Sequence, residues 1–323
     1  MKKRIIILAA FILVVIAAAS GAWYYFAGQV RQQIELLAFA DGETSPQLSC
    51  ASLGVTGFPF AFDVDCTDAV IVSGDVMMEV PGIRASAMVY DLTHFLASAK
   101  GPAEVSDAFT GQRSELSWTG LEGSLRLVGN RIARLSLVGD ELAWTDRLVG
   151  ETLLAKSSHA ELHLLDMPEA FDATNNRAGL ALFMTADALE LPPLALTDTH
   201  VEIEAEATGL PGDLSTLGAT PILPAWQQAG GALKIVAIRM NDASGDLTAS
   251  GDLALDAQGL LNGSIAIDSL GVAERIGPMI EEPWRTLVLG VPGADGRHTN
   301  QLNFRSGALS SGLIPITTIP PLF

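Results

Sequence analysis

Basic residues are scarce in this chain of 323 residues, in which 19 lysines and arginines stand against 37 aspartates and glutamates. The formal net charge is −18. Binding to phosphate backbones requires clustered lysine and arginine, so this composition argues against a nucleic-acid partner. Aromatic residues are also few, at 6%, and charged residues make up only 17%, whereas 49% of the chain is hydrophobic. This balance excludes global disorder and predicts a folded protein with a sizeable core.

The chain also lacks the common catalytic signatures: it has no G-x-S-x-G elbow, no Walker loop, and no G-x-G-x-x-G after a strand. His159, Glu161 and His163 would share one strand face and could ligate a metal, but a solvated strand face is the simpler interpretation. The alternating glutamates of 202–206 have the same simple interpretation, because a calcium site needs oxygens that converge from a loop. We therefore expect a protein that is not an enzyme and that has no metal and no cofactor.

Cysteine is limited to Cys50 and Cys66. A redox centre would normally use C-x-x-C, which is absent, and a metal site would need more cysteine or histidine than His94 nearby. A pair spaced by 16 residues in an exported protein most often forms a structural disulfide. We expect that bond here.

The N-terminus carries the one long hydrophobic run. Lys2, Lys3 and Arg4 precede 22 residues, 5–26, without a charge. That length can cross a hydrocarbon core of about 30 Å. The basic flank predicts a cytoplasmic tip, and the expected anchor residues are Ile5, Phe11, Trp23, Tyr24 and Tyr25. The alternative is a cleavable signal peptide, for which 17–19 offers an A-x-A pattern.

These features divide the chain into two parts. Residues 1–38 comprise the tip, the membrane anchor and a helical extension, and residues 39–323 form an exported β-rich domain with a weak internal boundary near 172–176. We expect a single-pass protein of the bacterial inner membrane with its C-terminal domain in the periplasm. Without residues 1–27 the net charge is −21. Contact with lipid would therefore have to be apolar rather than electrostatic.

Period-2 alternation dominates the exported part and predicts antiparallel strands and hairpins. The predicted strands span 125–128, 132–138, 142–145, 158–164, 179–186, 200–207, 233–240, 246–250, 252–256 and 264–268. Strand 233–240 is apolar at odd and even positions alike, so we expect both of its faces to be covered. Helical segments are expected at 272–280 and 284–289, partly at 214–228, and as one short turn at 91–99.

Four stretches in a fixed order resemble an uncharacterised bacterial family, domain of unknown function 2125, found mainly in alphaproteobacteria. They are Cys50…Gly57-Phe58-Pro59-Phe60…Cys66, then Val89 to His94 followed by Gly101-Pro102, then Trp226 to Leu233 with Gly251 to Gly259 and Gly263, and finally Gly307 to Ile316 with the ending Pro320 to Phe323. Family members often carry proline where Leu92 stands. The Phe58 and Phe60 segment is interpreted first as a packed turn, and binding is the alternative.

The glycine-punctuated strands and the anchor also resemble the AsmA-like group of envelope proteins. That resemblance implies a periplasmic β-sheet curved into a groove with an apolar interior and a link to lipid movement or outer-membrane upkeep. The fold we predict is mainly β: a single transmembrane helix followed by a long twisted antiparallel sheet, curved or groove-like, with a few packed helices.

Two functions are consistent with this fold. In the first, the protein binds or handles membrane lipid for envelope assembly or maintenance, and the candidate groove residues, whose alternative is ordinary core, are Leu233, Ile235, Val236, Ile238, Met240, Leu253, Leu255, Ile265 and Ile267. In the second, the protein is a structural or interaction module that binds another envelope protein through a sheet edge. A hydrolase would need His94, His298 or the His159–His163 pair to meet a carboxylate in a pocket.

Overall fold

The computed structural model describes residues 2–43, 45–214, 221–276 and 279–323, and it consists of one long helix and one 17-stranded sheet. The strands are β1 Gln47–Thr56, β2 Ala61–Ser73, β3 Val76–Met88, β4 Asp91–Lys100, β5 Ala103–Asp107, β6 Arg113–Ser117, β7 Gly120–Val128, β8 Arg131–Asp146, β9 Thr152–Asp166, β10 Arg177–Leu191, β11 Leu196–Pro211, β12 Ala232–Asp242, β13 Gly245–Leu255, β14 Leu261–Leu270, β15 His298–Arg305, β16 Ala308–Ser311 and β17 Ile314–Thr318. The helices are α1 Lys2–Leu37, α2 Ile222–Gln228, α3 Val272–Ile276 and α4 Trp284–Leu289, with short 3-10 turns at Pro168–Ala170 and Pro192–Leu194. The predicted mainly β fold is confirmed.

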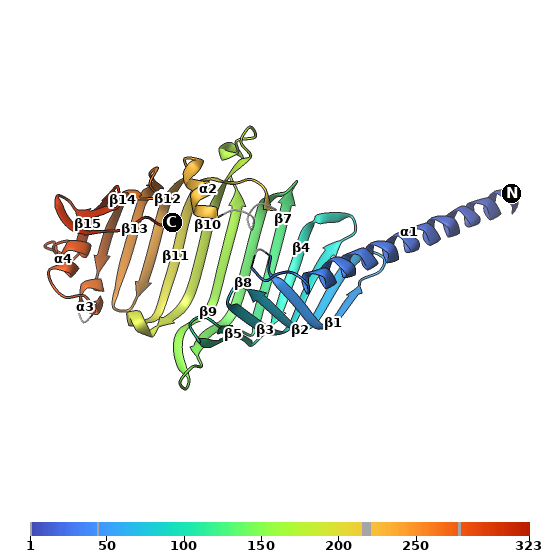
Figure 1. The fold of residues 1–323 in the computed structure, drawn as a ribbon, viewed down its shortest axis with the longest axis horizontal. Helices are drawn as coiled ribbons and strands as arrows, with labels where there is room; N and C mark the ends of the chain where they lie inside the picture. Colours follow the sequence, from blue (N-terminus) through green and yellow to red (C-terminus); the bar gives the residue numbers. More distant parts are fainter. Residues whose placement is uncertain (1, 44, 215–220, 277–278) are drawn as a thin grey trace.

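The sheet is an antiparallel meander. β4 and β5 pair successively along β3, and β6 and β7 pair successively along β8, so each couple acts as one interrupted strand. Counted in this way, every pairing among the described strands joins neighbours in the chain. The strands stack side by side along the long axis of the molecule, and α1 projects beyond the β1 end (Figure 1).

Several sequence predictions need correction. Residues 91–99 are not helical but belong to β4, whose side chains alternate between two faces. Gly251 does not separate two strands; it lies inside β13, opposite Ile265 of β14. The predicted weak boundary near 172–176 lies in the loop between β9 and β10 and stays a prediction. The predicted helical segments 214–228 and 272–280 lie partly outside the described residues, and their described parts contain α2 and α3.

A crease runs across the sheet from β1 to β11. Register pairing skips one or two residues at or close to one level of each strand, namely Ala51, Asp68, Pro81, Gly101–Pro102, Trp118–Thr119, Glu141, Ser158, Ala188 and, two residues from the skipped His200, Asp198. Four of these residues have left-handed backbones with φ between 46° and 49°. Such interruptions bend a sheet and shift its side-chain alternation by one residue.

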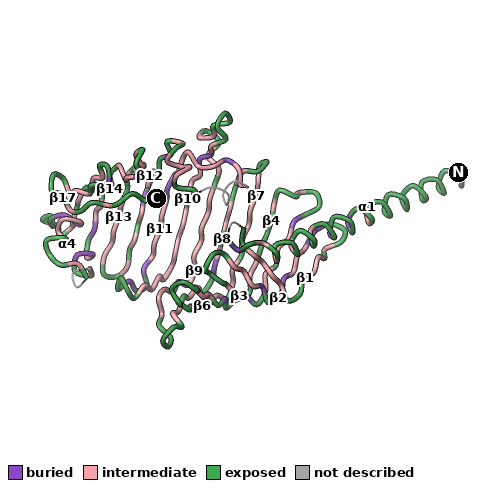
Figure 2. The backbone as a smooth tube through the Cα atoms, viewed as in Figure 1, coloured by how far each residue is buried: buried purple, intermediate pink, exposed green. Residues whose placement is uncertain are grey.

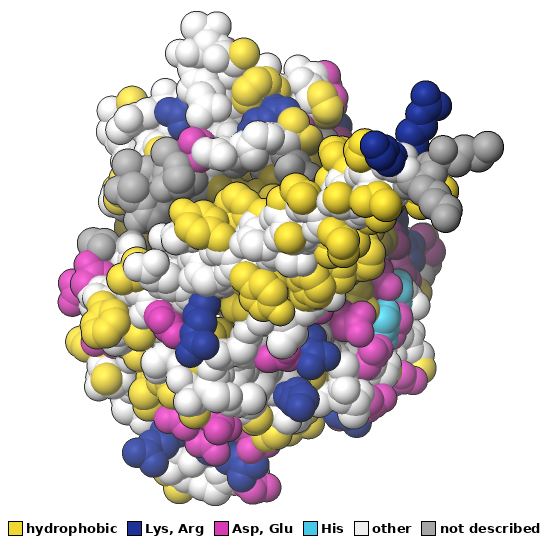
Figure 3. All heavy atoms as spheres, turned by 90° about the vertical axis from the view of Figure 1, so that its right-hand side faces the viewer, with side chains coloured by type: hydrophobic (Ala, Val, Ile, Leu, Met, Phe, Trp, Pro, Cys, Tyr) yellow, Lys and Arg dark blue, Asp and Glu magenta, His cyan; other side chains and the backbone are white. Residues whose placement is uncertain are grey.

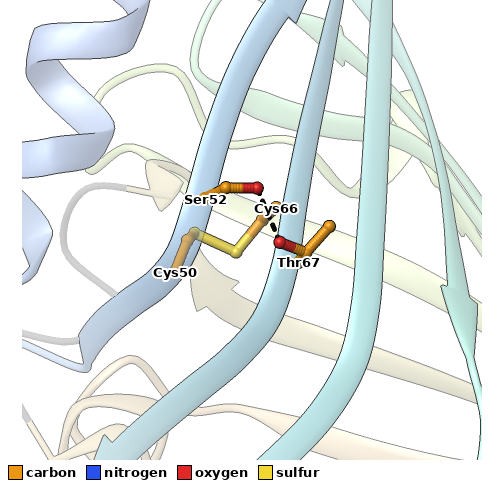
Figure 4. Close-up of a disulfide and its surroundings, with 4 residues drawn as sticks. All are labelled: Cys50, Ser52, Cys66 and Thr67. Carbon is orange, nitrogen blue, oxygen red and sulfur yellow. Dashed lines mark hydrogen bonds between the residues drawn. A yellow bond between two sulfur atoms is a disulfide. The ribbon is translucent and has the colours of Figure 1, made fainter.

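The bend brings together residues from both sides of the crease. Cys66 lies on one side, Ala69, Val80 and Ala103 lie on the other, and the four form one buried cluster. The disulfide between Cys50 and Cys66 crosses the crease with a Cα–Cα distance of 5.4 Å (Figure 4). The predicted disulfide is therefore confirmed, and it lies on the inside of the bend.

Candidate functional site

An apolar row crosses the sheet on the inner face of the bend. Directly paired residues of neighbouring strands share a face, so the register pairs define the row. From β2 to β15 it consists of Phe62, Ala87, Phe95, Leu125, Leu135, Leu164, Leu182, Ala205, Ile235, Gly251, Ile265 and Leu302. No member carries a polar side chain. With about 4.8 Å between strands, the row extends roughly 50 Å.

The opposite face is mostly polar. The row one residue away runs through Asp63, Ser86, Leu96, Ser124, Ser136, His163, Phe183 and Glu204. Its glutamates pair with Arg239 of β12, which contacts both Glu202 and Glu204. The sheet is therefore amphipathic over most of its length, with a wet outer face, as predicted for the glutamates of 202–206.

Eight of the nine predicted groove residues share the apolar face. Leu233 and Ile235 pair with Ala207 and Ala205 of β11, whereas Ile238 and Met240 pair with Ile203 and Val201. These partners alternate regularly, so the four residues lie on one face. The remaining residues on this face are Leu253, Leu255, Ile265 and Ile267.

The prediction that both faces of 233–240 are apolar is wrong. Register shifts at Val236, because this residue is the extra member of a β-bulge and stays exposed. The bulge reverses the alternation of side chains between the two faces. Leu233 and Ile235 before it therefore lie on the same face as Ile238 and Met240 after it.

The apolar face is half-buried rather than enclosed. Along β7–β14 most of its leucine, isoleucine and methionine side chains are only partly buried, and Leu137 is 42% exposed, whereas Leu196 of β11 is buried. Figure 2 shows the same pattern, with strands mainly of intermediate burial. In the described part of the chain the α-helices pack chiefly at β1–β2, at the C-terminal end of β11, and at β13–β15.

The crease opens into an apolar cavity of about 350 Å³ between β6 and β10. Its large apolar lining side chains are Leu116, Trp118, Leu121, Leu142, Trp144 and Leu189. Lys156 also lines the cavity, and its ammonium group lies 4.0 Å from Glu190. Ala155, Ala160 and Ala186 line the same space, and their short side chains leave it unfilled. Sequence analysis did not single out these residues, since Trp118 and Trp144 stand in ordinary strand contexts and only the crease brings them together.

At the β1 end the apolar face continues onto α1. Trp23 is buried, stacks on Phe62 at 5.6 Å between ring centroids, and donates a hydrogen bond from Nε1 to the Ala61 carbonyl oxygen at 2.9 Å. Ala27 and Val55 complete this contact. Trp23, predicted as an anchor residue, thus attaches α1 to the sheet. Ile5, Phe11, Tyr24 and Tyr25 are exposed on α1, which is long and apolar enough to cross a membrane.

Figure 3 looks at this end of the molecule. The hydrophobic side chains gather in the middle of the view and continue along α1 to the lysine and arginine side chains at its N-terminal end. The apolar surface of α1 and the apolar face of the sheet therefore meet at the contact between Trp23 and Phe62.

The histidines singled out from the sequence form a hydrogen-bonded chain on the polar face. Asp140 Oδ1 lies 2.7 Å from His159 Nδ1, and the two oxygens of Glu161 lie 3.0 Å from His159 Nε2 and 2.7 Å from His163 Nε2. His163 Nδ1 also meets the Ser136 hydroxyl at 2.9 Å. The chain is partly exposed and faces away from the apolar cavity. No group of three or more possible metal ligands occurs among the described residues.

His298 lines a pocket together with Glu274 and Glu282, but the hydrogen bonds of His94 and His298 go to other groups. His94 contacts Ser124 at 3.0 Å and Arg126 at 3.4 Å, and His298 Nδ1 lies 3.0 Å from the Gly290 carbonyl oxygen. These contacts fix strand and loop positions.

The pKa of His159 is raised by its hydrogen bond to Glu161 and, next, by that to Asp140. We expect NMR titration of the ring to give a midpoint above 6.5, and Glu161→Gln to lower that midpoint more than Asp140→Asn. Because the folded pKa is the higher one, this stabilisation is fully present below pH 6.5 and is lost as pH rises through the folded value. A midpoint at or below 6.5 would contradict the hydrogen-bonded chain.

Comparison with known proteins gives one match. The model of a family described as "Uncharacterized protein conserved in bacteria (DUF2125)" matches residues 23–320. No curated protein and no solved structure matches the chain. The matched range begins at Trp23 and covers the whole sheet, from β1 to β17.

Proposed function

The chain belongs to the DUF2125 family of uncharacterised bacterial proteins, and we propose that it is a membrane-anchored envelope protein whose apolar crease holds the acyl chains of membrane lipid. The observation that carries this proposal is the apolar row, which starts at the α1 contact and continues to β15. A lipid chain that leaves the bilayer beside α1 would meet this apolar row from β2 to β15.

The chemistry of the cavity supports an acyl chain rather than a polar metabolite. Ligand sites commonly occupy 300–1,000 Å³ and orient polar ligands with a few placed polar groups. The cavity has a suitable volume, about 350 Å³, but its lining is almost entirely hydrocarbon and indole. Such walls favour burial of methylene groups, worth about 0.8 kcal/mol each.

The proposed location is the bacterial inner membrane, with the sheet in the periplasm. Lys3 and Arg4 flank the apolar part of α1 on one side, which favours a cytoplasmic N-terminus. The Cys50–Cys66 disulfide favours an oxidising compartment for the sheet. The proposed role is binding without catalysis, and the His159 chain is assigned to the stability of the polar face.

The test is site-specific photocrosslinking in cell membranes. Benzoylphenylalanine in place of Trp144, which lines the cavity and is 43% exposed, is expected to crosslink to phospholipid, detected by mass spectrometry. Leu165 provides the matched control, because it is 42% exposed but pairs with Arg134 on the polar face. The same photoreactive residue at that position should crosslink little or no lipid.

A second variant tests occupancy of the cavity. Ala186→Phe would fill the space with a phenyl ring and is expected to suppress lipid crosslinking from position 144. Thr185→Phe is its neighbour on the polar face and should leave the yield unchanged. Equal lipid yields from positions 144 and 165 would sink the proposal, as would crosslinks from position 144 to protein alone. The latter result would favour the interaction module.

A further inference from the structure

We propose that the β1–β2 turn and the β3–β4 turn dip into the interface of the bilayer that α1 crosses, and so hold the β1 end of the apolar face against the membrane. This inference rests on the proposed anchoring by α1. The partner is the interfacial layer of the bilayer itself.

Exposed aromatic side chains are concentrated at these turns. Phe60 is 70% exposed and Tyr90 is 79% exposed, and Phe58, Tyr24 and Tyr25 are exposed beside them. Aromatic side chains are enriched where membranes meet water, and several of them gather at these turns and on the adjoining part of α1. Their exposure leaves an apolar patch that no described element covers.

The two turns and one level of α1 form a single unit. Phe58 packs against Trp23 edge to face at 5.5 Å and stacks on Tyr24 at 5.7 Å between ring centroids. The backbone N–H of Val89, in the β3–β4 turn, donates to the Phe60 carbonyl oxygen at 2.9 Å. The depth of α1 in a bilayer would therefore fix the depth of both turns.

The turn geometry depends on Gly57. Its φ is +96°, and a Cβ there would lie 2.8 Å from the Ala61 carbonyl oxygen. Only glycine accommodates this close approach at low cost. The turn is thus built to present Phe58 and Phe60 in fixed positions, although neither is buried.

The position along α1 matches the edge of a membrane. No charge follows Arg4 until Arg31, but the apolar part of this run, residues 5–26, ends at Phe26, shortly before Gly28 and Gln29. At about 1.5 Å per residue these 22 residues span about 33 Å, close to one hydrocarbon thickness. With Lys3 and Arg4 at one surface, Tyr24 and Tyr25 reach the other. Phe58 and Phe60 lie at that same level through the contacts described above.

The chemistry favours the apolar interfacial layer over anionic head groups. The exposed side chains named here are neutral, and the chain carries a net charge of −18. Electrostatic attraction to anionic lipid is therefore not available, and insertion would depend on aromatic and apolar contact. Vesicles of zwitterionic phosphatidylcholine are the appropriate probe.

The experiment uses the full chain in phosphatidylcholine vesicles whose acyl chains carry bromine, which quenches tryptophan at short range. Phe60→Trp is expected to add emission that the brominated vesicles quench, measured as the difference from the unsubstituted chain. Phe109→Trp is the control, because Phe109 is 85% exposed in the β5–β6 turn at the opposite ends of the strands. The 13 residues of β2 separate these ends by about 40 Å measured along the strand.

The outcomes separate this inference from the anchor itself. Flotation of the chain with the vesicles reports insertion of α1, and quenching reports the depth of position 60. Flotation without quenching at position 60 overturns the inference and leaves the anchor intact. Absence of flotation overturns both, and emission that is shifted to the blue without bromine quenching overturns the inference in favour of a protein contact.

Discussion

Replacing Asp242 by alanine is expected to lower the free energy of unfolding by about 3–5 kcal/mol, because it leaves the buried Arg275 guanidinium without its charged partner and with only the Ser244 hydroxyl in contact. Asp242 and Arg275 form an ion pair with an N–O distance of 2.5 Å, and their side chains are only 4% and 10% exposed. Asp242 also accepts hydrogen bonds from Thr199 and Ser244, so one carboxylate joins β11, β12 and α3. Urea unfolding measures the loss, and hydrogen exchange should show α3 released first.

Asp252→Ala is the matched control. Asp252 is exposed on the polar face of β13, and its removal should change stability by no more than about 0.5 kcal/mol. Arg275→Met combined with Asp242→Asn should cost less than Asp242→Ala alone, since no unpaired charge remains. A single variant as stable as the control would contradict the assigned role of the pair.

The same carboxylate makes a pH prediction. Burial alone raises the pKa of Asp242, but hydrogen bonds from Ser244, Arg275 and Thr199 outweigh it and lower the pKa to about 2. The folded pKa is therefore below the unfolded value, so the stabilisation is present above pH 3.8 and is lost as pH falls through about 2. Asp242→Asn should remove this acid-dependent part of the unfolding curve.

Removal of the disulfide by a combined Cys50→Ser and Cys66→Ser substitution is expected to cost about 3 kcal/mol, the loop-closure value for a loop of this size. The bond crosses the crease and adjoins the buried residues Ala69, Val80 and Ala103. Its loss should loosen the bend at the β1 end while the strands keep their pairing. Thermal unfolding and hydrogen exchange of β1 and β2 measure both effects.

A neighbouring contact supplies the control for this variant. The hydroxyls of Ser52 and Thr67 lie 2.7 Å apart beside the disulfide (Figure 4). Because this hydrogen bond is exposed, Ser52→Ala should cost no more than about 1 kcal/mol. If the two variants lost equal stability, the disulfide would add nothing to the stability that strand pairing already provides.

Local patterns in the sequence predict much of the fold. Alternation along 158–164 and 200–207 identifies β9 and β11, and the 22 mostly apolar residues 5–26 identify α1. Each of these patterns depends only on one element and on the surroundings of its faces, so it can be recognised in the sequence alone. The segment 91–99 misled us because its mixed side chains carry little periodicity. Its strand state comes from pairing with β3 and β7, which no local pattern reports.

The candidate site was only half predictable. Leu233 to Met240 could be recognised as apolar, but the bulge at Val236 that places them on one face depends on register with β11. The cavity could not be predicted from the sequence for a similar reason. Trp118 and Trp144 meet because left-handed residues such as Glu141 turn the strands at a common level, and a single sequence does not show which interruptions align.

The meander has a consequence for how the sheet assembles and how its length can change. When β4–β5 and β6–β7 are each counted as one interrupted strand, every described strand pairs only with its neighbours in the chain, so the sheet can assemble hairpin by hairpin from its N-terminal end. For the same reason, inserting or deleting one hairpin between β7 and β14 would lengthen or shorten the amphipathic sheet by about 10 Å without rerouting any other strand. The length of the amphipathic sheet can therefore change by one hairpin at a time, while the elements at its two ends stay the same.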